Sequence, residues 1–259
     1  MEQPILENQC DQLKYSVFPT RDDMGRQAAR DVAGKIVELQ EVQDDIRMIF
    51  AAAPSQNEVL HYLGEDERID WSKITAFHMD EYVGLDEQAP QLFQNYLMEH
   101  IFSSHPFKEI HLINSTNDFD FECNRYAELL REKAIDIVCL GIGENGHLAF
   151  NDPPVADFQD PDLVKVVELD EKCRQQQVND GCFSELSTVP EKALTLTIPA
   201  LLSATYMYCV VPGNTKADAI ARTLSGNIST ECPATILRTH PNAYLYVDRD
   251  SYSGVADGE

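Results

Sequence analysis

The residues of this chain that most clearly indicate chemistry lie around His147. This histidine ends the run 141–147, which holds three glycines, and Gly143 is the second of them. Asn145 and Asp152 lie on either side of the histidine in the sequence. An imidazole exchanges protons near neutral pH, and a nearby carboxylate can fix its tautomer. Glycines permit a tight turn and let a ligand approach the backbone closely. We interpret this segment as an acid–base site, with a histidine satisfied inside the core as the alternative.

A pair of adjacent carboxylates, Asp80 and Glu81, follows the apolar run 74–79. Two neighbouring acids repel each other, and the repulsion can raise the pKa of one of them. An acid held rigidly at the end of a strand could remove a proton as a general base. The alternative is a solvated loop on an acidic protein, which composition alone does not exclude.

A third candidate segment consists of Ser55, Gln56 and Asn57, which follow the apolar run 46–53 and precede a predicted helix. Backbone N–H groups at a helix N-terminus attract anions, and a hydroxyl and two amides would add donors there. Ser55 and Glu58 also have the spacing of a capping box, in which two side chains satisfy each other's backbone N–H groups. The segment predicts an anion site, with an ordinary helix cap as the alternative.

A lone lysine, Lys216, ends the turn 212–216, which follows the apolar run 206–211. A lysine on a strand-to-helix turn could hold a phosphate group as a point charge, although alone it could equally be a surface lysine. In open α/β sheets, ligands bind beyond the carboxyl ends of the strands. Because all four candidate segments follow predicted strands, we expect them to share one pocket.

The elements that would position these segments alternate along the chain. Thr20 is a predicted helix cap, because acids and then apolar residues at three-to-four-residue spacing follow it. Strands are predicted at 46–53, 74–79, 107–113, 135–140, 193–198, 206–211 and 243–247, and helices at 20–39, from 55 onward, and at 90–102, 118–133 and 216–224. This alternation predicts an α/β fold, whose largely parallel sheet carries helices on both faces. We expect residues 1–259 to form one domain, with a frayed tail at 251–259.

Charge and composition exclude several classes of protein. The 259 residues include 20 Lys and Arg against 44 Asp and Glu, for a formal net charge of −24. Such acidity repels nucleic acids and anionic membranes, so neither is an expected partner, and it also disfavours an anionic substrate. No apolar run reaches the roughly 18 residues of a membrane-spanning helix. The first residues lack the features of a secretory signal, so we expect a cytoplasmic protein.

The cysteines point in the same direction. There are seven, an odd number, with no Cys-x-x-Cys pair, and several lie inside apolar runs. This pattern favours reduced, buried thiols over disulfides or a zinc site.

Two long segments read Phe-His-Met-Asp-Glu-Tyr-Val-Gly-Leu at 77–85 and Gly-Ile-Gly-Glu-Asn-Gly-His-Leu-Ala-Phe-Asn-Asp-Pro at 141–153. Shorter segments at 189–190, 213–216 and 239–243 follow in the same order. Together they resemble the signature sequences of the glucosamine-6-phosphate deaminase family. The resemblance covers most of the chain, and the two long segments are specific.

The resemblance implies a single Rossmann-like α/β domain that converts glucosamine 6-phosphate reversibly into fructose 6-phosphate and ammonia, without a metal or cofactor. By motif position, His147 helps to open the sugar ring and Asp80 moves a proton between C2 and C1. Asp152 stands where the family has a supporting glutamate, and Lys216 where a lysine holds the phosphate. The remaining expected binding residues are Ser55, Gln56, Asn57 and Gly143. A homo-oligomer with a small sugar phosphate as its ligand is also expected.

This chain departs from the family pattern at several positions. The family's phosphate loop commonly reads Thr-Gly-Gly-Thr, whereas residues 55–58 here are Ser-Gln-Asn-Glu. Asn145 replaces an aspartate that pairs with the catalytic histidine, and Asp152 is one methylene shorter than the usual glutamate. The family's phosphate-binding arginine has no counterpart near 179–182, because Arg174 is displaced. Residues for an allosteric amino-sugar phosphate site are not evident either. These departures indicate a divergent subgroup.

Three alternative functions remain open from the sequence. A deaminase could act on another epimer, such as galactosamine 6-phosphate. A 6-phosphogluconolactonase would share the fold and the glycine–histidine segment, but that family lacks the continuation at 149–153 and the Met-Asp-Glu-Tyr of 79–82. A sugar-phosphate sensor without activity could also use this fold, although no helix-turn-helix or basic patch links the chain to DNA.

Overall fold

Residues 3–255 are described by the computed structural model of the chain. The main sheet has eight strands in the order β1-β2-β11-β10-β7-β3-β4-β6, and each neighbouring pair is parallel except β1 and β2. The strands span Leu6–Cys10 (β1), Leu13–Phe18 (β2), Ile46–Phe50 (β3), Ile74–His78 (β4), Glu109–His111 (β6), Ile137–Leu140 (β7), Tyr206–Val211 (β10) and Ala243–Asp248 (β11). The predicted largely parallel sheet is confirmed.

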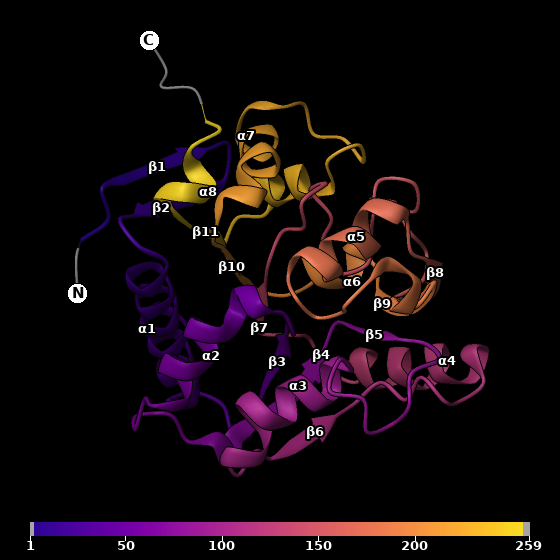
Figure 1. Cartoon of the computed structure of the whole chain (residues 1–259). Helices are drawn as coiled ribbons and strands as arrows, with labels where there is room; N and C mark the ends of the chain where they lie inside the picture. The colour runs from indigo at the N-terminus through magenta and orange to yellow at the C-terminus, as the bar shows by residue number, and fades with distance from the viewer. Residues whose placement is uncertain (1–2, 256–259) are drawn as a thin grey trace.

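Helices cover both faces of this sheet, as the sequence predicts (Figure 1). Along β7, Ile137 and Cys139 belong to one core, and Val138 and Leu140 belong to the other, because successive strand residues point to opposite faces. The first core packs against α1 (Arg21–Gln40), α2 (Asn57–Gly64) and α3 (Phe93–His100). The second packs against α4 (Phe119–Arg131), α6 (Ile198–Leu202) and α7 (Ala217–Ser225).

The first long helix shows how local sequence sets these elements. Thr20 has extended backbone angles, and its side chain accepts the N–H of Asp23, so it caps α1 as predicted. The buried residues of this helix recur at helical spacing and form a stripe against the sheet: Met24, Gly25, Ala28, Ala29, Val32, Ala33 and Ile36.

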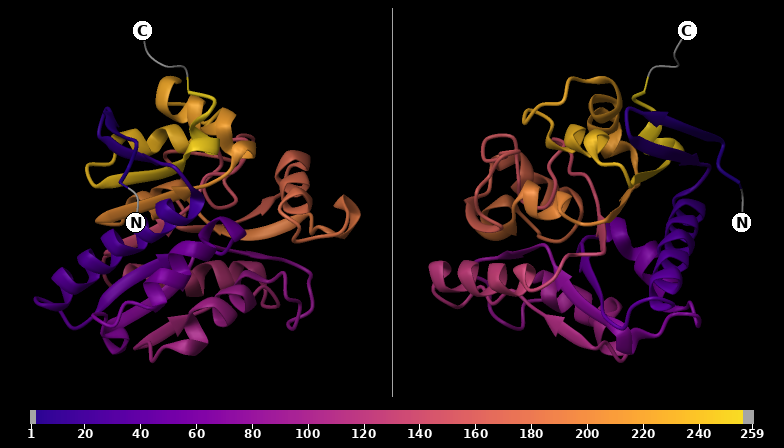
Figure 2. Two further views of the ribbon diagram at one scale, coloured as in Figure 1. Left: turned by 60° about the vertical axis from the view of Figure 1, so that its left-hand side comes forward. Right: turned by 180° about the vertical axis from the view of Figure 1, so that it is seen from behind.

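A second, smaller sheet was not predicted. It joins β5 (Asp80–Tyr82), β9 (Lys192–Leu196) and β8 (Val164–Glu168) as antiparallel neighbours. Residues 193–198 are thus correctly predicted as extended in their first part, but they belong to this sheet and not to the main one. Figure 2 shows this part of the chain, in orange, extending to one side of the main sheet. The small sheet matters for function because its strand β5 begins with Asp80.

Elements from the start and the end of the described chain lie side by side (Figure 1), because β2 pairs with β11 and packs against α8 (Arg249–Tyr252). Ser251 is fully buried in a capping box with Asp248. The expectation of a frayed tail starting at 251 is therefore wrong for the first of these residues, and residues 256–259 lie outside the described part. Between residues 3 and 255, none of the helices combines the length and apolar character needed to cross a membrane.

Candidate active site

The candidate segments meet where the strand order of the main sheet reverses. From β3 the chain continues outward to β4 and β6, whereas β7 returns to the other side of β3 and is followed by β10. The carboxyl ends of β10, β7, β3 and β4 are therefore consecutive along one edge. A crevice forms at such a reversal because the loops of neighbouring strands diverge there.

A cavity of about 200 Å³ occupies this position. Its wall includes five of the residues that the sequence predicts for the site: Ser55, Asp80, Gly143, His147 and Lys216. Four other predicted residues, Gln56, Asn57, Asn145 and Asp152, are not part of the wall. The predicted shared pocket thus forms, with at least one wall residue from each of the four candidate segments.

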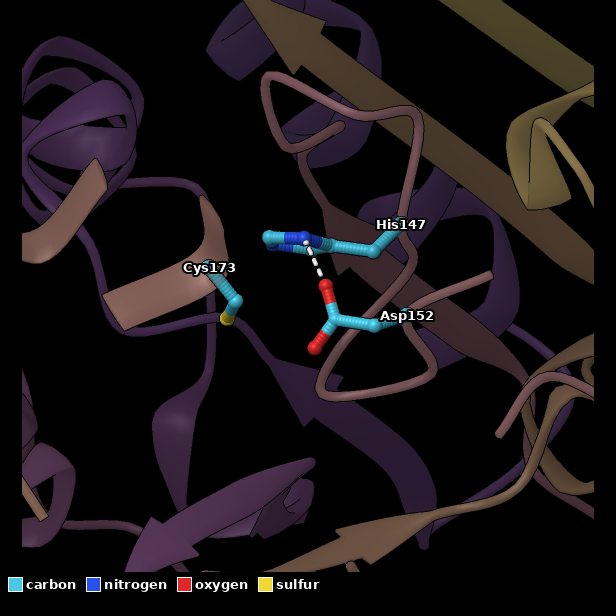
Figure 3. Close-up of side chains that lie close together, drawn as sticks. All are labelled: His147, Asp152 and Cys173. Carbon is cyan, nitrogen blue, oxygen red and sulfur yellow. Dashed lines mark ion pairs between the residues drawn. The ribbon is translucent and has the colours of Figure 1, made fainter. Parts of the chain in front are cut away.

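His147 and Asp152 form an ion pair beside the cavity (Figure 3), with Nδ1 of the ring 2.8 Å from Oδ1 of the carboxylate. The same oxygen accepts a hydrogen bond from the amide of Asn145 at 2.8 Å. Asp152 is 1% exposed. Burial alone would raise the pKa of its carboxyl, but His147 and Asn145 together hold that pKa below its usual value. Asp152 is therefore ionised and can stabilise a protonated imidazole.

A tight turn returns Asp152 to His147. Within this turn Ala149 adopts a left-handed backbone conformation with φ of 49°, which is uncommon for a residue with a side chain. The amide of Asn151 donates to the carbonyls of Leu148 and Leu196 at 2.9 and 2.8 Å. These bonds tie the turn to β9 of the small sheet and fix the position of the following carboxylate.

Glycine is required beside the histidine. A Cβ atom at Gly143 would lie 2.1 to 2.4 Å from three atoms of the His147 ring, far inside contact distance. Gly146 has φ of 88°, and a Cβ there would lie 2.5 Å from the sulfur of Cys232. The glycine-rich segment therefore serves to bring the imidazole against the backbone. No helix follows it directly, because the next helix is α5 (Glu171–Asn179).

The two adjacent acids have different environments. Asp80 is on the cavity wall, and burial, assisted by the charge of Glu81, raises the pKa of its carboxyl well above the usual value. Glu81 points elsewhere and accepts the N–H groups of Tyr82, Phe93 and Gln94 at 2.9, 3.0 and 2.9 Å. Burial raises the pKa of Glu81 to about 7, against the opposing effect of these bonds. Glu81 thus anchors the start of α3, whereas Asp80 is available to a ligand.

Lys216 is a buried cation on the cavity wall. It is 5% exposed, and its Nζ atom has no hydrogen-bond partner among the described residues. Burial lowers the pKa of its ammonium group, while the charges of Asp180 and Glu144 oppose that shift. A buried ammonium without a partner is costly unless a ligand supplies the missing anion.

The segment 55–58 differs from its prediction. Pro54–Gln56 forms a short 3₁₀ turn before α2, and no side chain caps that helix. The expected capping box is wrong, because Glu58 pairs with Arg21 instead, at 2.7 Å. The amide of Gln56 is buried near the carbonyls of Leu140 and Val210, so it joins strand ends instead of facing the cavity. Asn57 is exposed and accepts a hydrogen bond from Tyr96 at 2.6 Å.

Sequence reasoning missed several wall residues. They are Arg21, Phe93, Phe150, Gln176, Gln177 and Asp180. Arg21 follows β2, a strand that was not predicted, and so it was not inspected as a strand-end residue. Gln176 and Gln177 belong to α5, whose polar sequence gives little helical signal. A search for polar residues after every strand, short edge strands included, would have found Arg21.

The sulfur of Cys173 lies beside the His147–Asp152 pair (Figure 3). One ligand atom from each of these three buried residues lies within 4.8 Å of the others. Imidazole, carboxylate and thiolate are donors that zinc accepts, although burial raises the pKa of the Cys173 thiol well above its usual value and keeps it protonated. All seven cysteines are free thiols, as predicted.

Comparisons with known proteins identify the family to which the chain is similar. A family model described as glucosamine-6-phosphate isomerases/6-phosphogluconolactonase matches residues 19–245. The chain is 36% identical to the glucosamine-6-phosphate deaminase of Bacillus cereus strain B4264 over 187 residues. These residues cover 72% of this chain and 70% of the relative. It is 35% identical over 192 residues to that of Exiguobacterium sibiricum, covering 74% of each.

Solved structures extend the likeness to the fold. A structure described as a monomeric glucosamine-6-phosphate deaminase is 29% identical with a TM-score of 0.85, covering 94% of this chain and 99% of that one. A 6-phosphogluconolactonase from Thermotoga maritima is 21% identical with a TM-score of 0.73, covering 91% and 100%, which shows a shared fold. The chain therefore belongs to the family of glucosamine-6-phosphate isomerases and 6-phosphogluconolactonases.

Proposed function

We propose that this protein is a glucosamine-6-phosphate deaminase, which converts glucosamine 6-phosphate and water into fructose 6-phosphate and ammonia. The observation that carries the proposal is the position of Asp80. Its buried carboxylate lies on the wall of the cavity that His147 and Lys216 also line. The named activity of relatives that are 35 and 36% identical supports the same reaction.

In this proposal His147 opens the sugar ring by moving a proton between the O1 hydroxyl and the ring oxygen. The ion pair with Asp152 stabilises the imidazolium form that arises while the ring nitrogen holds that proton. Asn145 has no charge to offer, and it acts by orienting the Asp152 carboxylate. The product of this step is the open-chain aldehyde.

Asp80 then removes the proton from C2 of the aldehyde and returns it to C1. While C1 takes up this proton, a proton from the amino group passes to O1, so the double bond moves and leaves an imine at C2. Water hydrolyses the imine to the ketone with release of ammonia. One base must reach two adjacent carbons, and a carboxylate on a short strand between two sheets is held rigidly enough to do so. A raised pKa makes Asp80 a stronger base than an exposed carboxylate and brings it closer to the working pH.

Lys216 and Ser55 would hold the phosphate at the other part of the wall. A phosphate group would give the buried ammonium of Lys216 the partner that it otherwise lacks. The net charge of −24 opposes any sugar phosphate at long range. A local, buried cation overcomes that field because charges interact more strongly where water is excluded.

The test is to incubate the purified protein with glucosamine 6-phosphate and to measure ammonia and fructose 6-phosphate. Asp80→Asn should lower kcat at least about 10²-fold, because it removes the base and keeps the shape. Asp44→Asn is the matched control, since Asp44 is a surface acid with a 91% exposed side chain. Equal rates for Asp80→Asn and the control would show that the catalytic assignment is wrong.

Parallel reactions separate the remaining alternatives. If galactosamine 6-phosphate releases ammonia with a higher kcat/KM than glucosamine 6-phosphate does, it is the preferred substrate and the type of reaction stays the same. Hydrolysis of 6-phosphogluconolactone without release of ammonia from either amino sugar would make the protein a lactonase. Binding of these compounds without turnover would make it a sensor.

A homo-oligomer and a cytoplasmic location stay predictions of the sequence. The solved deaminase with a TM-score of 0.85 is described as monomeric, so that relative does not support an oligomer. The mass of the protein in solution, measured by light scattering, decides between a monomer of 29.2 kDa and a multiple of it.

A further inference from the structure

A phosphate monoester carries about 1.5 to 2 negative charges near neutral pH, whereas Lys216 supplies one positive charge, so a bound phosphate can take a second cation. The arginine expected near 179–182 is not available for this purpose. Arg174, the arginine nearest to that position, donates through Nη2 to the carbonyls of Leu186 and Val189 at 3.0 and 2.9 Å and is not on the cavity wall. It braces the segment after α5 instead.

Arg21 is the other candidate. Among the described residues, Arg21 and Lys216 are the only Lys or Arg side chains on the cavity wall. Arg21 is the first residue of α1, and the wall also includes Pro54 and Ser55 from the loop after β3. Its side chain is 40% exposed, so a ligand in the cavity can reach it.

Two contacts fix the guanidinium of Arg21 from one side. Its Nε atom lies 2.7 Å from Oε1 of Glu58, and its Nη2 atom donates to the carbonyl of Pro54. Neither contact uses Nη1. An arginine held in this way keeps donors for a second anion and loses little further side-chain freedom when it binds one.

Gly25 explains how Glu58 comes so close to α1. A Cβ atom at Gly25 would lie 2.3 Å from the Cβ atom of Glu58, so a larger residue would force the two helices apart. Gly25 is four residues after Arg21, which places the two on the same face of the helix. The close contact therefore sets Glu58 directly beside the arginine.

We propose that Arg21 is the second cation of the phosphate subsite and that Glu58 is a positioning residue for its guanidinium. The inference rests on the proposed function, and it assigns a phosphate monoester to the part of the cavity between Arg21, Ser55 and Lys216. An arginine matches two phosphate oxygens with parallel N–H donors, whereas the lysine contributes a point charge.

The experiment measures binding of inorganic phosphate by calorimetry, which does not require turnover, and then KM and kcat for glucosamine 6-phosphate. Arg21→Gln should weaken phosphate binding at least about tenfold and raise KM by a similar factor. It should change kcat less than about threefold, because Arg21 does not touch the reacting carbons. Arg26→Gln is the matched control, because Arg26 follows on the same helix, pairs with Asp22 and Tyr62, and is not on the wall.

Two further variants keep the proposal testable if Arg21→Gln folds poorly. Arg21→Lys keeps the positive charge but loses the parallel N–H donors of the guanidinium. Its affinity for phosphate should therefore lie between those of the wild type and Arg21→Gln. Glu58→Gln keeps both cations and should weaken phosphate binding severalfold with kcat unchanged.

Phosphate binding at wild-type affinity by folded Arg21→Gln or Arg21→Lys would overturn the inference, and ammonia release would still support the deaminase. The opposite result is also informative. If the wild type releases no ammonia, the proposed function is wrong. If Arg21→Gln nevertheless binds phosphate more weakly than the wild type, the assignment of Arg21 still holds.

Discussion

The amide nitrogen of Asn145 lies 2.8 Å from Oδ1 of Asp152, the oxygen that also contacts the ring of His147. In addition, the amide oxygen of Asn145 accepts the backbone N–H of His147 at 3.0 Å. The neutral amide therefore joins the two halves of the pair. A carboxylate at position 145 could not donate to Asp152, so this chain has one charged partner for the histidine and one neutral brace.

The first prediction is that Asn145→Asp, which restores the usual family residue, impairs this protein. Two carboxylates would then face each other, and their repulsion raises the pKa of Asp152. Both carboxylates are ionised and repel each other only above this raised pKa, so we expect the loss of kcat relative to the wild type to grow as pH rises, and the free energy of unfolding to drop by about 1–3 kcal/mol. Asn145→Ala is the control, since it removes the bond without adding charge and should lose activity evenly across pH. The prediction would be contradicted if Asn145→Asp kept both the melting temperature and the activity of the wild type at high pH.

The second prediction is that Asp80→Asn stabilises the protein while it abolishes activity. The folded-state pKa of Asp80 is raised by burial, so its ionisation opposes folding. The stability that a neutral carboxyl provides is complete below the unfolded pKa of about 4 and is lost as pH rises through the folded pKa. The melting temperature of Asp80→Asn should therefore exceed that of the wild type by more at about pH 8 than at about pH 5.5.

The neighbouring acid provides the control for this effect. Glu81→Gln should lower the melting temperature, because its carboxylate accepts three N–H groups and an amide oxygen can replace only one of the two acceptors. Opposite signs for these adjacent substitutions are expected. If Asp80→Asn melted below the wild type at both pH values, the carboxylate would not be a strained, functional group.

The third prediction concerns the unpaired ammonium of Lys216. Lys216→Met should raise the melting temperature near neutral pH, since the burial that lowers the pKa of this group also penalises its charge in the folded state. It should also raise KM for glucosamine 6-phosphate at least about tenfold. Inorganic phosphate should raise the melting temperature of the wild type and leave that of the variant nearly unchanged. Equal protection of both proteins would show that the anion binds elsewhere.

Much of this site could be predicted from the sequence because its strands are buried on both faces. Such strands are near-continuous apolar runs, as at Ile46–Phe50 and Ile137–Leu140, and the polar residues that follow them are easy to locate. Four strand ends then suffice to place Asp80, His147 and Lys216 in one pocket. The order of the strands was not needed, since parallel strands end at the same edge.

The unpredicted parts have weaker local signals. The strand Val164–Glu168 is short and half-exposed, Asp80–Tyr82 has three residues, and Glu171–Asn179 is a helix with almost no apolar face. Tertiary contacts, and not local propensity, decide such elements. The pairing of Arg21 with Glu58 was hidden for the same reason, because it depends on two helices meeting at Gly25.

The fourth prediction tests whether the glycine segment positions the histidine. Gly143→Ala places a methyl group within 2.1 to 2.4 Å of the His147 ring, so the ring must move and its contact with Asp152 must break or lengthen. We expect kcat to fall at least about 10²-fold, because a displacement of about 1 Å at a catalytic group has that effect. Phosphate affinity should change little, because Lys216 and Arg21 are unaffected.

Gly34→Ala is the control for this substitution. Gly34 is an exposed residue of α1 with nothing within 4 Å of an added Cβ, so alanine should raise the free energy of unfolding by about 0.5–1 kcal/mol and leave kcat unchanged. The comparison separates loss of backbone freedom, which both variants share, from displacement of the imidazole, which only Gly143→Ala causes. Wild-type kcat in Gly143→Ala would mean that His147 works from another position, and its contact with Asp152 would then have no part in ring opening.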